Sequence, residues 1–167
     1  MVNKLIIVVL VLAVVFGSWF AYYFSDKEVI KRQLTGLAGK LEKEAGETPI
    51  QLAFKMRAVK DQLADRCQVL VPEQSFDEAL EQDLIIRYLM YRHNSYEVIT
   101  VVFEELQVDI PAKGEAAAQV TVRINMNEAN QEEAVEESGQ VELTLKKGED
   151  NWLLHTVIVP ENLVMIE

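Results

Sequence analysis

Histidine and cysteine are scarce in this chain of 167 residues, which holds two His and a single Cys. One cysteine can form no internal disulfide, and by itself it cannot complete a zinc site. A free cysteine is usually a small buried apolar residue, and we expect that role for Cys67. A catalytic thiol would need a basic partner, and only His93 and His155 could offer an imidazole.

The sequence also lacks the short motifs that hold cofactors or metals. It contains no Gly-rich phosphate loop, no HExxH and no CxxC. Glutamates crowd residues 128–138, but the alternating Asp and the Gly that shape a calcium loop are missing. A solvated loop is the better interpretation of that stretch, and we expect neither a cofactor nor a metal.

Basic residues are fewer than acidic ones. The chain has 16 Lys and Arg and 27 Asp and Glu, which gives a net charge of −11. The phosphates of a nucleic acid would be repelled, so we expect no nucleic-acid partner. The same acidity argues against a broad contact with anionic lipid headgroups.

Charge is absent altogether from residues 5–24, LIIVVLVLAVVFGSWFAYYF. A helix of that length spans the hydrocarbon core of a bilayer, and Trp19, Tyr22 and Tyr23 fall where aromatic rings prefer the interface. We therefore expect residues 1–26 to be a single-pass anchor in the inner (plasma) membrane. The alternative is a cleaved signal peptide, but its apolar run is shorter and ends in small residues, whereas FAYYF is bulky.

The charges beside the anchor bear on its orientation. Lys27, Lys31 and Arg32 follow the apolar run, whereas Lys4 precedes it. This bias would keep the following domain inside, but long domains cross the membrane largely regardless of charge. We expect the domain on the outer side, periplasmic or extracellular.

Residues 27–167 match one ordinary domain in length. Apolar residues at helical spacing predict helices over 27–45, from Pro49 to about Asp65, and over 76–93. Thr48 is the expected N-cap of the second helix. Ser75, with Glu78 as a capping box, is the expected N-cap of the third.

Extended segments occupy the rest of the domain. β-rich composition predicts a short strand over 67–71 and a long one over 97–110. Alternating apolar and polar residues predict strands over 116–127 and 139–147, and the turn KKGEDN leads into a last strand over 151–159. Helices followed by a run of antiparallel strands are typical of an α+β fold.

The closing hairpin 143–159, LTLKKGEDNWLLHTVIV, places a strand, a Gly/Asp turn, a Trp and an aliphatic strand in succession. Together with the order of elements over about 28–159, it resembles the nuclear transport factor 2-like superfamily (SnoaL-like, cystatin-like cone). The resemblance implies three helices packed on a curved antiparallel sheet of about four to five strands, around a cone-shaped cavity. Members include hydratases, isomerases, polyketide cyclases and many non-catalytic dimerisation domains, so the fold alone does not give the function.

Enzymes of that superfamily place Asp, His or Tyr groups inside the cone. The ligand-pocket candidates here are Asp83, Tyr88, Tyr91, Arg123 and Trp152. Asp83 and Arg87 are also spaced to pair on one helix face, and a charged His93 would complement the helix dipole. No Asp–His pair shares a short motif, and we expect no catalytic residue.

Segment 97–110 is apolar on both faces. Val98, Val102 and Leu106 lie on one side, and Ile99, Val101 and Phe103 lie on the other. A sheet with one face in water should be apolar on one side only. The second face would then be covered by a partner, by a second copy or by the apolar tail 160–167. The partner-surface candidates are Ile99, Val101, Phe103 and His155.

Two hypotheses follow. The leading one is a non-catalytic, membrane-tethered binding or assembly domain whose sheet face mediates homodimerisation or docking to another envelope protein. The alternative is a cavity enzyme or carrier that acts on a small hydrophobic ligand near the membrane. They differ in whether ionisable side chains converge inside the cone.

Overall fold

The computed structural model describes residues 11–18, 25–127 and 134–164. The predicted span 5–24 therefore lies mostly outside the described residues, and its described part, 11–18, is helical. Within the described ranges, no helix is both long and apolar enough to cross a membrane.

Two helices open the domain. Helix α2 (Asp26–Leu41) begins at Ser25, whose side chain accepts a hydrogen bond from the Glu28 N–H. Helix α3 (Pro49–Lys60) begins as predicted, because Thr48 and Gln51 form a reciprocal capping box and Pro49 occupies the first turn. Both helices end earlier than their apolar periodicity predicted.

The predicted third helix is wrong over its first six residues. Phe76–Glu81 form strand β2, which pairs antiparallel with strand β1 (Leu63–Val71), and helix α4 runs from Gln82 to Ser95. Ser75 is not an N-cap: its φ of 53° closes a short 3-10 turn, η1 (Pro72–Gln74), which reverses the chain into the hairpin. Pairing with β1 satisfies the backbone of β2, and this tertiary contact outweighs the local helix signal.

The six strands form one sheet in the order β2-β1-β6-β5-β4-β3. The four later strands pair antiparallel in succession, and β6 also lies parallel to β1, so the sheet is mixed. These strands are β3 (Val98–Ala112), β4 (Glu115–Asn127), β5 (Val135–Lys147) and β6 (Trp152–Ile158). The α+β class is confirmed, but the expected four to five antiparallel strands are corrected to six because one strand was assigned to a helix.

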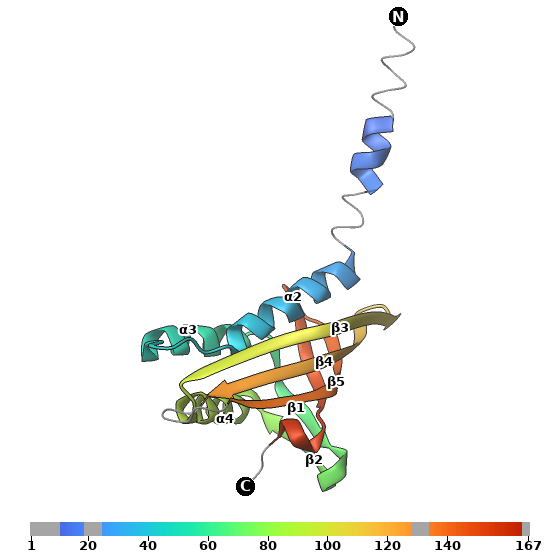
Figure 1. Ribbon diagram of the computed structural model, residues 1–167. Helices are drawn as coiled ribbons and strands as arrows, with labels where there is room; N and C mark the ends of the chain where they lie inside the picture. The colour runs from blue at the N-terminus through green and yellow to red at the C-terminus, as the bar shows by residue number, and fades with distance from the viewer. Residues whose placement is uncertain (1–10, 19–24, 128–133, 165–167) are drawn as a thin grey trace, which may run out of the picture.

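The pairing register shifts at four places in the sheet, and two of these shifts bear on the site. Strand β3 has one extra residue opposite β4, where Glu105 adopts a φ of 53°, and β6 has one extra residue opposite β5 at His155. Bulges bend and twist a sheet. In Figure 1, β3, β4 and β5 run across the view, whereas β6 and β1 run steeply behind them.

The core lies between this bent sheet and the helices, with α2 alongside β3 (Figure 1). The largest fully buried side chains come from both layers and include Trp152, Ile30, Leu34, Met56, Leu145 and Val120. Cys67 is fully buried among them, as expected, and burial raises the pKa of its thiol to about 11.

Candidate functional site at the open end of the cone

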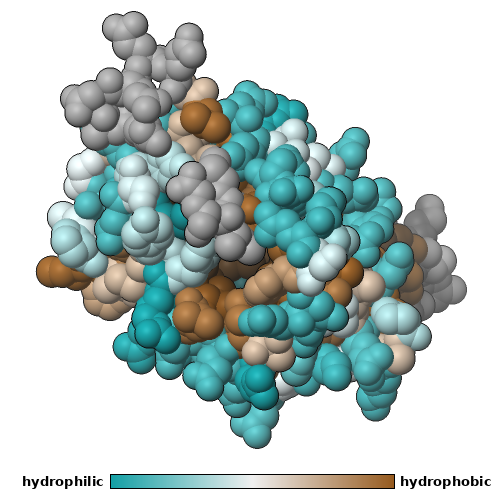
Figure 2. All heavy atoms as spheres, turned by 90° about the horizontal axis from the view of Figure 1, so that it is seen from below, coloured by the Kyte–Doolittle hydropathy of each residue, from teal (hydrophilic) through white to brown (hydrophobic). Residues whose placement is uncertain are grey.

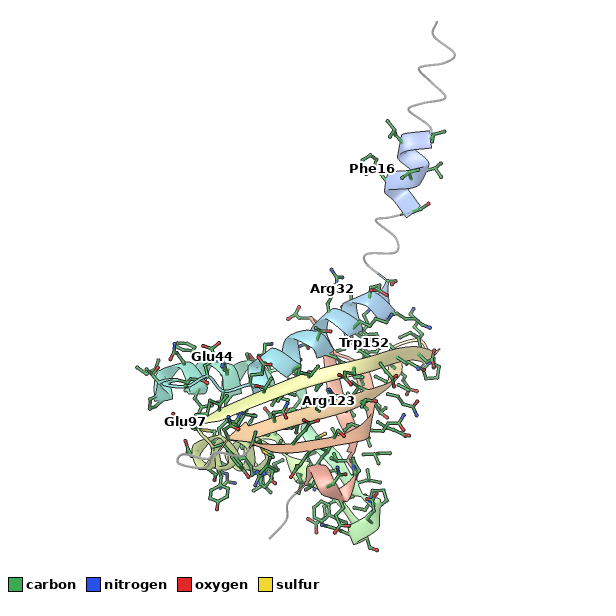
Figure 3. All side chains as sticks on the ribbon, viewed as in Figure 1. Phe16, Arg32, Glu44, Glu97, Arg123 and Trp152 are labelled. Carbon is green, nitrogen blue, oxygen red and sulfur yellow. The ribbon has the colours of Figure 1, made fainter. Side chains whose placement is uncertain are left out.

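The apolar side chains between α4 and the inner face of the sheet are only partly covered by the described residues. These side chains come from α4, β4, the end of β6 and the C-terminal turn η2 (Glu161–Leu163), and each of them is half-buried. They are Ile85, Leu89, Ile124, Val157, Val159 and Leu163. We call this region the cone mouth. Seen from below in Figure 2, apolar residues gather around a hollow in the middle of this face of the molecule.

Three ionisable side chains meet at the cone mouth. Tyr88 and Arg92 lie one turn apart on α4. Glu137 comes from β5, where it pairs directly with Ile124 of β4 and so shares the inner face of the sheet. Arg92 reaches the same face, because its Nη2 lies 3.8 Å from Met126 Sδ.

The proton affinities of these groups are coupled. Burial raises the pKa of the Tyr88 phenol, the charge of Arg92 lowers it, and Tyr96 and Glu137 raise it further. Burial also raises the pKa of Glu137, against the opposing effect of Arg92. Neighbouring groups with shifted pKa values in a partly apolar recess are typical of a functional site.

Of the predicted pocket residues, Tyr88 lies at the cone mouth. Asp83 is exposed at the start of α4, where an ion pair of 2.7 Å with Lys60 of α3 lowers the pKa of its carboxyl. Arg87 does not pair with that carboxylate; it donates to the backbone carbonyl of Asp83. Tyr91 is 69% exposed on the solvent side of α4.

Arg123 and Trp152 lie away from the cone mouth. Arg123 is on the outer face of the sheet, with its guanidinium 3.1 Å from Glu104 and 3.7 Å from Glu136. Trp152 is 1% exposed in the core. The side-chain amide of Gln33 on α2 accepts from its backbone N–H and donates to its backbone carbonyl.

Three of the four partner-surface candidates point inward. Ile99 and Val101 are each 6% exposed, and Phe103 packs partly buried against the same core. The bulge at Glu105 shifts the phase of β3, which brings Leu106 to this inner face too and explains why the segment looked apolar on both sides. The fourth candidate, His155, is half-buried in the β6 bulge, and burial lowers its pKa.

The described part of the C-terminal segment, residues 160–164, packs at another place than the expected cover of β3. Pro160 and Leu163 pack over Gly139 of β5 so closely that an added Cβ there would lie 2.6 Å from Pro160 Cγ. Gly139 pairs with Val122 and therefore belongs to the inner face. The tail thus borders the cone mouth and does not cover the outer face of β3.

Sequence reasoning missed Arg92 and Glu137. Glu137 was assigned to a solvated loop, yet β5 begins at Val135, and the alternation of Val141 and Gly139 continued backwards places Glu137 inward. The spacing of Arg92 four residues after Tyr88 was the other available signal.

A second polar cluster lies behind α4. His93 is 3% exposed and hydrogen bonds with the backbone of Leu41, while its Nδ1 has no hydrogen-bond partner among the described residues. Burial, with the charges of Lys43 and Lys55, lowers the pKa of His93, whereas Glu47 raises it. The expected cation at the end of α4 is therefore not His93, which is held neutral.

Lys43 takes that role instead. Its Nζ donates to the carbonyl oxygens of His93 at 2.7 Å and Tyr96 at 2.6 Å, where a helix C-terminus favours positive charge. Lys55 Nζ lies 3.1 Å from Glu47 Oε1 and donates to the Glu42 carbonyl at 3.0 Å. A cavity of about 280 Å³ adjoins this cluster. Since both lysines bond to groups of the chain itself, we interpret the cluster as a clamp that holds the α2–α3 connection on α4.

Comparison with known proteins shows the fold. No protein-family model matches the sequence, and no curated protein matches it either. Among solved structures, a proposed scytalone dehydratase from Novosphingobium aromaticivorans is 14% identical, with 78% of this chain and 79% of that chain covered and a TM-score of 0.63.

Two further structures agree with it. A proposed dehydratase of the NTF2-like family from Streptomyces avermitilis is 12% identical over 81% of this chain and 94% of that chain, with a TM-score of 0.62. A proposed aromatic ring hydroxylase from Novosphingobium aromaticivorans is 11% identical over 78% and 84%, with a TM-score of 0.61. The chain therefore has the nuclear transport factor 2-like fold that its sequence resembles, and identities this low show the fold alone.

Proposed function

We propose that the domain binds a small hydrophobic molecule at the cone mouth, as a carrier or an enzyme. The apolar part of the ligand would lie against Leu89 and Ile124, and its polar group would face the three ionisable side chains. The observation that carries this proposal is the convergence of Tyr88, Arg92 and Glu137 above an apolar lining that the chain leaves half-covered. The names of the neighbouring folds, two dehydratases and a hydroxylase, support a cavity function over an assembly function.

An enzyme at this site would use acid–base chemistry. Glu137, with its raised pKa, retains a proton to higher pH than an ordinary glutamate, and Tyr88 is a hydrogen-bond donor beside it. A carrier would use the same groups to hold the polar end of its ligand. Both versions need the ligand in the cone mouth, so binding is the first property to measure.

The test is calorimetric titration of the full chain with 2-naphthamide, a neutral apolar probe. Leu89→Trp fills the cone mouth, and we expect it to weaken binding at least about tenfold. The matched control is Leu84→Trp on the same helix, where the side chain is 44% exposed to solvent and binding should not change. Absence of binding to the wild type, or equal loss in both variants, would refute the proposal.

The apolar segment 5–24 supports a location beside the membrane, with the domain on the outer side. A hydrophobic ligand could then be exchanged with the bilayer. Alkaline phosphatase fused after Glu167 should be active, since that enzyme requires an oxidising compartment. An inactive fusion protein in the membrane fraction would reverse the proposed orientation, and a chain found free of membranes would remove the anchor.

Assembly through the outer sheet face remains a second candidate function. Val102 is 39% exposed there, beside Val98, and a second copy of the chain is the partner to test. Val102→Glu should then halve the mass of the full chain measured by light scattering, whereas Thr35→Glu, at an exposed position of α2, is the control that should keep the mass. Equal masses for the wild type and Val102→Glu would refute this candidate.

A further inference from the structure

We propose that the ligand of the cone mouth is an amphipathic monocarboxylate, and that the guanidinium of Arg92 binds its carboxylate. This inference rests on the proposed function and specifies its ligand. It is carried by the surroundings of Arg92.

The positive charge of Arg92 is met by poor hydrogen-bond acceptors. Its guanidinium contacts Met126 Sδ and lies 5.1 Å from the centre of the Tyr96 ring. The ion pairs among the described residues do not include it. A guanidinium has five N–H donors, and a thioether and a ring face are poor acceptors for them. A half-buried cation in this state gains most from a planar anion that accepts two hydrogen bonds at once.

Glu137 on the sheet side is an acidic group whose charge acts on Arg92, and it neutralises Arg92 incompletely. Burial disfavours its ionised form, and the two groups act on each other without forming an ion pair. When Glu137 holds its proton, it becomes a hydrogen-bond donor to a neighbouring carboxylate and no longer competes for Arg92. Tyr88, from the same helix as Arg92, supplies a second polar side chain at this point.

The apolar side chains of the cone mouth indicate that the part of the ligand beyond its carboxylate is hydrophobic. Beside Arg92 the inner face presents Ile124, Val157 and Leu163, which bind methylene or aryl groups and offer no side-chain hydrogen bonds. Arg92 is the cation that acts on both Tyr88 and Glu137 here, and the chain carries a net charge of −11. A phosphate or a dicarboxylate would bring more negative charge than this site can balance, so a single carboxylate fits best.

The experiment compares two isosteric probes, 2-naphthoate and 2-naphthamide, on the full chain by calorimetry at neutral pH. We expect the wild type to bind the naphthoate at least about tenfold more tightly than the amide. Arg92→Gln should abolish this preference while it retains binding of the amide. Arg87→Gln, on the solvent side of the same helix, is the matched control and should retain the preference.

The outcomes separate the two proposals. If both probes bind equally to the wild type, the carboxylate assignment is overturned but the hydrophobic site stands. If neither probe binds, the proposed function itself fails. If Arg92→Gln keeps the preference for naphthoate, another cation is responsible, and circular dichroism of that variant shows whether its fold is intact.

Discussion

The two ends of the cone differ in how completely the same sheet is covered. At the closed end, Trp152 and Leu145 are shielded by α2 and have 1% and 0% of their surface exposed. At the open end, Leu89 and Ile124 are only half-buried although they belong to the same apolar cluster. The comparison shows that the closed end contributes buried apolar area to stability, whereas the open end leaves apolar and ionisable side chains accessible, which is the surface that the proposed ligand would use.

The largest expected effect comes from truncating the closed end. Trp152→Ala should lower the free energy of unfolding by about 3–5 kcal/mol, because it removes a fully buried side chain and leaves a cavity. Leu89→Ala at the open end should cost only about 1–2 kcal/mol, since solvent already reaches that side chain. Urea denaturation of the full chain measures both values, and equal losses would show that the two ends are packed alike.

Acid should weaken the clamp behind α4. His93 has a pKa below its usual 6.5 in the folded chain, so the unfolded chain binds more protons just below that value. The free energy of unfolding should therefore fall as the pH is lowered through 6.5 and continue to fall until the folded-state pKa is passed. His93→Gln should flatten this part of the profile, whereas His155→Gln, at a more exposed histidine, should leave most of it. A profile unchanged in His93→Gln would remove His93 as its cause.

Glu137→Gln should strengthen binding of naphthoate several-fold at pH 7, because it removes the resident competitor for Arg92. In the wild type the affinity should fall as the pH rises through the raised pKa of Glu137, where the carboxyl ionises. The variant should lose this dependence. Glu136→Gln is the control, since that residue pairs with Arg123 on the outer face. The same pH dependence in Glu137→Gln would show that another group controls the site.

The smallest effect is expected on the outer surface of α2. Gly36→Ala adds a Cβ that meets no atom within 4 Å, in an exposed helical position. It should raise the free energy of unfolding by about 0.5–1 kcal/mol and leave ligand binding unchanged. Gly139→Ala is the informative contrast, since it would collide with Pro160 beside the cone mouth. A destabilising Gly36→Ala would mean that this face of α2 is covered.

The sequence was a good guide where local signals and tertiary contacts agree. The capping box at Thr48 and Pro49 placed the start of α3, and clean alternation placed β4 and β6 to within a residue or so. The fold class and the superfamily resemblance followed from those elements. It failed at Phe76–Glu81, where a convincing capping pattern was overridden by pairing with β1, a contact that no local window contains.

The candidate site was harder to predict, because it depends on which face of its strand each side chain points to and on contacts between residues far apart in the sequence. Tyr88 was identified from its residue type, but the inward direction of Glu137 follows only from where β5 begins. The bulge at Glu105 separated Leu106 from Val98 and Val102, since one inserted residue moves the residues that follow it to the other face. An irregularity of this kind leaves no clear mark in composition or periodicity.

Strand β3 ends the sheet, and most of its outer edge has no strand beside it apart from the bridge at Ile99. Fifteen extended residues would offer a template on which further chains could stack into fibrils. The kink at Glu105 and the missing N–H of Pro111 interrupt that template. The bulge at Glu105, which made the two faces of this strand hard to predict from the sequence, thus also hinders edge-to-edge pairing between copies of the chain.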